Sequence, residues 1–283
     1  MAAHLLNLLI LCVTSFSLLV ATSAHAQTSD LKRNQEIKAA FTSGIRSEQL
    51  FTQKLQKFGL TAKKNEILLH HYRSIVRDQE VIDRIYQEVV SLGVIDRALK
   101  SPQAVLSDTK ALESIGSELF TTLSIKGLRR LEFRDQRVFV EVVSRIFNAV
   151  PARTCKQLLV NNVSPTQQAE LEIVIYRDLS DSEMDNYLNV LRRGLFAEVK
   201  NFPNVKTTTE TQRITAEKAL GESFLRNISS HPRSSQLGRA IVDLHAATDN
   251  DACDTGRILV RSLLDMKGLA AEWQTRVFIE SSQ

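Results

Sequence analysis

Glycine and proline are scarce in this chain, which has 10 Gly and 5 Pro among 283 residues. That is about half of average usage, and since these residues punctuate secondary structure, their scarcity predicts long uninterrupted elements. Three cysteines in this length exclude a small disulfide-rich scaffold, and 43% hydrophobic residues exclude intrinsic disorder. The 36 basic and 32 acidic residues leave a formal charge of only +4, a mild basic excess.

The N-terminal segment lacks charged residues. Leu5 to Val20 is an apolar run, and the small and polar stretch Ala21 to Ala26 follows it. Ala24 and Ala26 form the A-x-A pattern that signal peptidase cleaves. We predict a signal peptide over residues 1–26, cleaved after Ala26, and an exported chain that is periplasmic or else secreted. The start also lacks Lys and Arg, and the alternative is an uncleaved segment that anchors the chain in a membrane.

Cleavage would remove Cys12 and leave Cys155 and Cys253 in an oxidising compartment. A cysteine pair in that setting predicts a disulfide. Two separate buried thiols are the alternative. A catalytic cysteine is not indicated, because the sequence has no C-x-x-C motif and neither cysteine has a histidine close by.

Apolar residues recur at helical spacing through nearly the whole chain, which predicts an all-α fold. We expect a multi-helix bundle or irregular array of about ten helices, beginning with a long helix from Asp30 to Gly59 that is broken near Gly44. Only Val138 to Val143 resembles a strand, because it is rich in β-branched residues. The helical stripe from Asp135 to Val150 is too long for a strand and favours a helix. Ser164 to Gln167 and Ser180 to Glu183 are typical of capped helix starts.

The segment Asn204 to Thr209 is polar and β-branched, without a helical stripe, and predicts a linker. It divides the chain into an N-terminal helical lobe, residues 27–203, and a C-terminal helical lobe, residues 204–283. A Cys155–Cys253 bridge would cross the linker, so we expect one domain with two lobes. The C-terminal helices are predicted at residues 211–228, 234–247, 255–266 and 269–279.

A helical hairpin is predicted around Tyr176 to Val205. A capped start, Leu179-Ser180-Asp181-Ser182-Glu183-Met184, is followed by Tyr187-Leu188 and then by Leu191-Arg192-Arg193-Gly194. This pattern resembles the helical hairpin of an uncharacterised domain family of exported Gram-negative proteins. The resemblance covers about 30 residues and departs from the family pattern because the proline before the glycine is missing. It implies an envelope location and a helical fold, and no activity.

Motifs for catalysis or cofactor binding are lacking. The sequence has no G-x-S-x-G elbow, P-loop or Rossmann glycine pattern. His70 and His71 are adjacent, so on a helix they cannot share a metal as an i, i+4 pair would. Asp249 to Gly256 departs from a calcium loop, since Asp254 stands where glycine is needed. It is predicted to be a solvated loop that caps the next helix at Asp254 or Thr255. We predict no catalytic residue, metal ligand or cofactor.

Basic residues are concentrated in two places. Five of them fall within the twelve residues from Lys126 to Arg137, and two more are adjacent at Arg192 and Arg193. On neighbouring helices they would form a positive patch for an acidic protein or anionic lipid, whereas the alternative is a solvated face partly neutralised by Glu132 and Asp135. Nucleic acid is not expected as a partner, because the compartment is wrong and aromatic residues are few. The predicted anionic-partner patch consists of Lys126, Arg129, Arg130, Arg134, Arg137, Arg192 and Arg193.

Three classes of function follow. The first is an exported, non-enzymatic interaction protein, such as an adaptor, an assembly factor or an immunity-type inhibitor, whose partner is another envelope or secreted protein. The second is a protein that binds lipid or an anionic envelope surface through the basic patch. The third is an envelope hydrolase whose site is assembled from scattered groups, among them His70, His71, His231 and His245. The absence of catalytic motifs favours the first.

Overall fold

The computed structural model describes residues 30–93, 95 and 109–282, and in this part of the chain every regular element is a helix. Thirteen α-helices and one short 3-10 turn (η1) confirm the all-α prediction, with more and shorter helices than the ten expected. The predicted signal peptide, residues 1–26, lies outside the described residues. The elements are α2 (Asp30–Ile45), α3 (Glu48–Leu55), η1 (Gln56–Phe58), α4 (Ala62–Arg77), α5 (Gln79–Ser91), α8 (Thr109–Leu128), α9 (Phe133–Ala149), α10 (Ala152–Leu159), α11 (Pro165–Asp178), α12 (Asp181–Val199), α13 (Glu210–Ser229), α14 (Ser234–Val242), α15 (Asp249–Asp265) and α16 (Gly268–Ser281).

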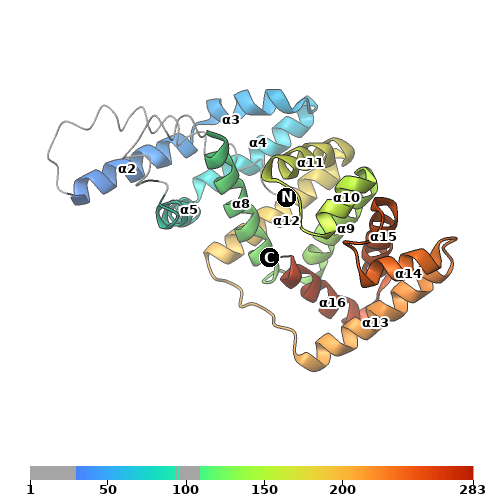
Figure 1. Ribbon diagram of the computed structural model, residues 1–283. Helices are drawn as coiled ribbons and strands as arrows, with labels where there is room; N and C mark the ends of the chain where they lie inside the picture. Colours follow the sequence, from blue (N-terminus) through green and yellow to red (C-terminus); the bar gives the residue numbers. More distant parts are fainter. Residues whose placement is uncertain (1–29, 94, 96–108, 283) are drawn as a thin grey trace.

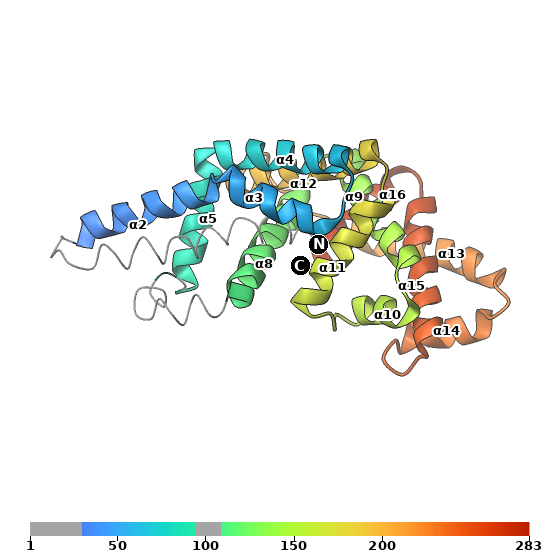
Figure 2. The ribbon, with the colours of Figure 1, turned by 90° about the horizontal axis from the view of Figure 1, so that it is seen from above.

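The helices form an elongated array whose two ends differ. Figure 1 and Figure 2 place α2, α3 and α5 at one end and α13 and α14 at the other, with α8, α9 and α12 between them. Helix α12 packs against α8, α4, α9 and α5. It is therefore the central element of the larger part of the molecule, which consists of the helices before the linker.

The expected long first helix is interrupted at Arg46-Ser47, close to the break predicted near Gly44. The Ser47 amide donates to the Gly44 carbonyl at 3.0 Å, so the chain turns before α3 begins. The segment ends at Gly59, whose φ of 61° lies in the left-handed region that glycine adopts without strain.

The capped starts and the helix over the β-branched segment are confirmed. Ser164 and Ser180 each accept a hydrogen bond from the backbone of the third helical residue, whose side chain bonds back to the cap. The segment that resembled a strand lies inside α9. Its apolar stripe is buried and includes Phe139, Val142, Val143, Ile146 and Phe147.

Helices α8 and α12 cross at backbone contact because each has a glycine at the crossing. A Cβ atom added at Gly127 would lie 1.7 Å from the Gly194 carbonyl oxygen, and one at Gly194 would lie 2.5 Å from the Ser124 carbonyl oxygen. No side chain fits between these backbones, so the spacing of the two central helices depends on both glycines.

The hydrophobic core continues across the linker. The largest cluster of buried apolar residues includes Cys253, Val260, Leu263 and Ile279 together with residues of α4, α9 and α12. A separate small cluster of Phe224, Ile228 and Leu237 lies among the C-terminal helices. Residues 202–209, which include the predicted linker, contain no helix.

Two helix boundaries after the linker were predicted wrongly. Helix α14 ends at Val242 instead of continuing to Ala247, and α15 begins at Asp249, so the expected acidic loop is the first part of a helix. Thr248 caps α15 by accepting a hydrogen bond from the Asp251 amide at 3.1 Å. Asp254 and Thr255 are therefore inside the helix and do not cap it. Acidic residues in the first turn are favoured by the helix dipole, which explains why this stretch is helical.

Candidate functional site

Four of the seven basic residues of the predicted anionic-partner patch make polar contacts inside the fold. Arg130 is buried and donates to the Glu198 carboxylate at 2.9 Å, to Asn201 Oδ1 at 2.6 Å and to the Pro203 carbonyl at 2.9 Å. These bonds attach the start of the linker to the end of α8. The side chain that the sequence suggested for an external partner therefore stabilises the fold.

The other arginines of this set are distributed over different contacts. Arg193 pairs with the buried Asp135 at 2.8 Å, and Arg137 donates to the Leu264 carbonyl at 2.6 Å. Arg192 donates to Asn189 Oδ1 at 2.8 Å. Lys126 and Arg134 are exposed, while Arg129 is half-buried. Arg193 is exposed as well, so three members of the predicted patch, Lys126, Arg134 and Arg193, are exposed.

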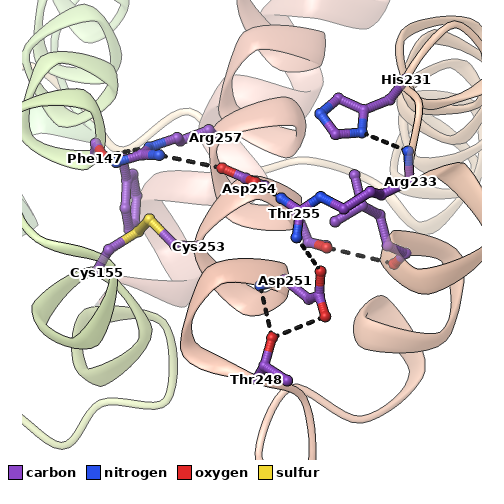
Figure 3. Close-up of polar contacts among 11 residues, drawn as sticks. Phe147, Cys155, His231, Arg233, Thr248, Asp251, Cys253, Asp254, Thr255 and Arg257 are labelled. Carbon is purple, nitrogen blue, oxygen red and sulfur yellow. Dashed lines mark hydrogen bonds and ion pairs between the residues drawn. A yellow bond between two sulfur atoms is a disulfide. The ribbon is translucent and has the colours of Figure 1, made fainter.

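The predicted disulfide is present between Cys155 on α10 and Cys253 on α15, with their Cα atoms 5.3 Å apart (Figure 3). Both cysteines are fully buried. Near the bridge, Gly256 gives Leu159 room to approach, since a Cβ at Gly256 would lie 2.6 Å from Leu159 Cδ1. The bridge therefore fixes α10 and α15 in close contact across the linker.

An arginine–aspartate network surrounds the first turns of α15 (Figure 3). Arg233 binds Asp251 at 2.6 Å and also pairs with Asp254, and Arg257 binds Asp254 at 3.1 Å. Arg257 Nε also donates to the Phe147 carbonyl at 2.7 Å, which connects the network to α9. Asp251 and Asp254, which belong to the segment that resembled a calcium loop, are thus paired with guanidinium groups rather than converging on a cation.

Of the histidines weighed for a hydrolase, His70 and His71 are adjacent on α4, with ring centroids 5.4 Å apart, whereas His231 and His245 follow the linker. His71 is 2% exposed, and its Nε2 lies 2.9 Å from Asp185 Oδ1. Burial lowers the pKa of His71, and the hydrogen bond with Asp185 partly opposes this. His231 Nδ1 accepts a hydrogen bond from the Arg233 amide, while His70 and His245 are exposed. Within the described residues, no group of three or more His, Cys, Asp or Glu side chains is arranged to hold a metal ion.

Two buried tyrosines on adjacent helices have strongly shifted pKa values. Burial raises the pKa of Tyr176 and of Tyr187, and the nearby charge of Glu172 raises both further. Both phenols are therefore held in the protonated form.

Exposed apolar side chains are a feature that the sequence analysis did not identify. Ile214 and Leu225 on α13 are 58% and 64% exposed. They are eleven positions apart, which is about three helical turns, so they lie on one face of the helix. Nearby elements add Ile241 and Val242 at the end of α14 and Leu269 at the start of α16. The spacing of Ile214 and Leu225 was a signal in the sequence, but their exposure depends on which face of α13 packs inward.

The inner face of α13 is held firmly. Its buried residues are Ala216, Ser223, Phe224 and Ile228, and the helix packs against α15 and α16. Ser223 Oγ donates to the Ser262 carbonyl at 3.0 Å, and Asn227 donates to Ser262 Oγ at 2.9 Å. These contacts leave Ile214 and Leu225 exposed, and α13 lies at the edge of the array in Figures 1 and 2.

Comparisons of this chain with protein-family models, curated proteins and solved structures found no match. The resemblance of Tyr176 to Val205 to an exported hairpin family thus stays a prediction. Over residues 30–93, 95 and 109–282, none of the helices combines the length and hydropathy needed to cross a membrane.

Proposed function

We propose that this protein is an exported, non-enzymatic helical interaction protein that binds another envelope or secreted protein through the outer face of α13. The supporting observation is the pair Ile214 and Leu225, exposed on one face of a helix that is rigidly held on its other side. Exposed apolar side chains on one face of a helix give another protein a surface against which it can bury apolar area. An adaptor, an assembly factor and an immunity-type inhibitor would all use such a surface.

The reactive groups support a structural role rather than catalysis. The aspartates near the disulfide pair with arginines, and the buried tyrosines are held in the protonated form. In this proposal the polar groups position the helices, and the outer face of α13 contacts the partner.

The test is crosslinking in the living envelope. The tagged chain is expressed in its native host, crosslinked and purified, and the captured proteins are identified by mass spectrometry. We expect the tagged chain with the natural sequence to capture one stoichiometric protein partner. We expect the double variant Ile214→Glu, Leu225→Glu to lose this partner. Mass spectrometry of the purified chain also tests export, since cleavage after Ala26 leaves Gln27 as the first residue.

The matched control is Val174→Glu on α11, an exposed valine on a different helix. The control variant should retain the partner, and circular dichroism should show equal helix content in all three proteins. Equal capture of the partner by the double variant and the control would overturn the assignment of α13. Recovery of the chain alone, or with lipid only, would overturn the protein-partner proposal and favour the lipid-binding alternative.

A further inference from the structure

A hollow lined by three arginines lies between the turn that joins α2 to α3 and the last turns of α4. In Figures 1 and 2, α2 lies at the opposite end of the array from α13. Its volume is about 400 Å³. The lining residues are Arg46, Glu48, Tyr72, Arg73, Val76 and Arg77. This site is independent of the proposed partner surface.

The wall of the hollow is fixed by aromatic contacts. The Tyr72 hydroxyl donates to the Ile45 carbonyl and lies 3.4 Å from the Ser47 carbonyl oxygen. The Tyr72 ring stacks on Phe51 with a centroid distance of 3.9 Å. These contacts hold the break between α2 and α3, so Arg46 extends from a rigid turn.

The arginines converge from two segments. Arg73 and Arg77 are one turn apart on α4 and lie on the same face. Arg46 Nε donates to the Val76 carbonyl at 3.0 Å, and its Nη2 donates to Gln79 Oε1 at 2.8 Å. These two bonds orient the guanidinium while using only two of its five N–H groups.

The hollow has a positive balance. Among the described residues that line it, Glu48 alone is acidic, and it forms a forked pair with Arg73 that includes an Nε–Oε2 bond of 2.9 Å. The hydrogen bond from Arg73 lowers the pKa of Glu48, slight burial opposes this, and the charges of Arg73 and Arg77 lower it further. Three arginines and one glutamate leave two positive charges, which match a phosphate monoester of about −1.5 to −2. Guanidinium forks suit the paired oxygens of such a group.

A second hollow of about 740 Å³ adjoins the first along α2, and Arg46 lines both. Its other polar lining includes Gln35, Ser43 and Gln79. Lys38 also lines it, but its charge is balanced by Asp83 at 2.9 Å. This space is therefore polar with little excess charge, which suits the uncharged body of a molecule whose anionic group sits among the arginines.

We propose that the hollow formed by Arg46, Arg73 and Arg77 binds the phosphate group of a small molecule, whose polar body lies along α2. The chemistry that recognises the ligand is the phosphate monoester, and its source is either a soluble metabolite or a lipid headgroup.

The first test is thermal unfolding of the purified full chain with increasing inorganic phosphate, at an ionic strength held constant with sodium chloride. Phosphate that binds only the folded chain should raise Tm with concentration. Arg77→Gln should weaken the apparent affinity about fivefold, as expected for loss of one nearby charge. Glu48→Gln should strengthen it by a similar factor, because it removes the negative charge of the hollow. Arg226→Gln, an exposed arginine on α13, is the matched control and should respond like the natural sequence.

The second test separates the two sources. Glycerol phosphate that binds more tightly than inorganic phosphate, with no capture by vesicles, would identify a soluble ligand. Flotation with phosphatidylcholine vesicles that contain phosphatidic acid, lost in Arg77→Gln and kept in Arg226→Gln, would identify a headgroup. The proposal is overturned if inorganic phosphate, glycerol phosphate and the vesicles with phosphatidic acid all leave the protein unaffected, or if Arg77→Gln and Arg226→Gln respond alike.

Discussion

The helices before the linker and those after it are stabilised in different ways. Before the linker, α12 packs on four other helices, and α8 and α12 touch at backbone distance. After it, α15 and α16 share the main hydrophobic core, whereas the separate cluster of Phe224, Ile228 and Leu237 is small. The disulfide and arginines such as Arg257 and Arg137 add further links to the helices before the linker. Close packing holds one region, and specific links reinforce the attachment of the other.

The exposed apolar side chains follow the same division. Five of the nine large hydrophobic residues that are exposed in the described part of the chain lie after the linker, among them Leu225 and Val242. A region that is tied in place by covalent and polar links can keep apolar side chains on its surface. The comparison therefore supports the C-terminal helices as the partner-binding region, whereas the phosphate site proposed here belongs to the other end.

The largest effect is expected from removing the disulfide. Replacing Cys155 and Cys253 by Ala should lower the free energy of unfolding by about 4 kcal/mol, because the bridge closes a loop with a sequence separation of 98 residues. Hydrogen exchange should increase most in α14 and α15, and less in α8 and α12. If the replacement increased hydrogen exchange equally in both regions, the distinction between them would be contradicted.

Gly127→Ala tests the close packing of the larger region. The new methyl group would overlap the Gly194 carbonyl, so α8 and α12 must separate, and we expect a loss of about 3 kcal/mol in chemical denaturation. Gly221→Ala in α13 is the control, because a Cβ there meets nothing within 4 Å. It should stabilise the helix by about 0.5–1 kcal/mol. A similar loss of stability in Gly127→Ala and Gly221→Ala would show that the backbone contact between α8 and α12 does not cause the effect.

Arg130→Leu removes the buried side chain that attaches the linker to α8. We expect a loss of about 2 kcal/mol, because Glu198 and the Pro203 carbonyl lose a charged donor. Urea denaturation measures the change, with Arg134→Leu as the exposed control. If both variants unfold at the same urea concentration, Arg130 does not contribute to the junction.

Acidification should weaken the larger region through His71. Since burial lowers the pKa of His71 in the folded chain, the unfolded chain binds more protons below its own pKa of about 6.5. Stability is therefore retained above that pH and falls as the pH drops toward the folded value. We expect a loss of about 1 kcal/mol between pH 7 and pH 5.5. The pH dependence of unfolding should flatten in His71→Gln and persist in His70→Gln, whose residue is exposed.

Local chemistry was a reliable guide to the helices themselves. The starts at Ser164 and Ser180 were predictable because a capping residue acts on amides within its own first turn. The start of α15 was missed although Thr248 and Asp251 carried a capping signal. Its acidic residues are typical of loops, and the guanidinium of Arg233 that pairs with two of them comes from another segment.

The sequence by itself determined the all-α class and most helix boundaries, because these depend on residues within one or two turns of each other. It also indicated the Cys155–Cys253 pairing, since only two cysteines follow the predicted signal peptide. The tertiary structure decided which basic residues are buried, which face of α13 is exposed and which arginines meet in one hollow. Arg46 lies in the turn after α2 and Arg77 at the end of α4, and no local pattern records the packing that brings them together. That packing depends on contacts between residues distant in the sequence, such as the bond from the Tyr72 hydroxyl to the Ile45 carbonyl.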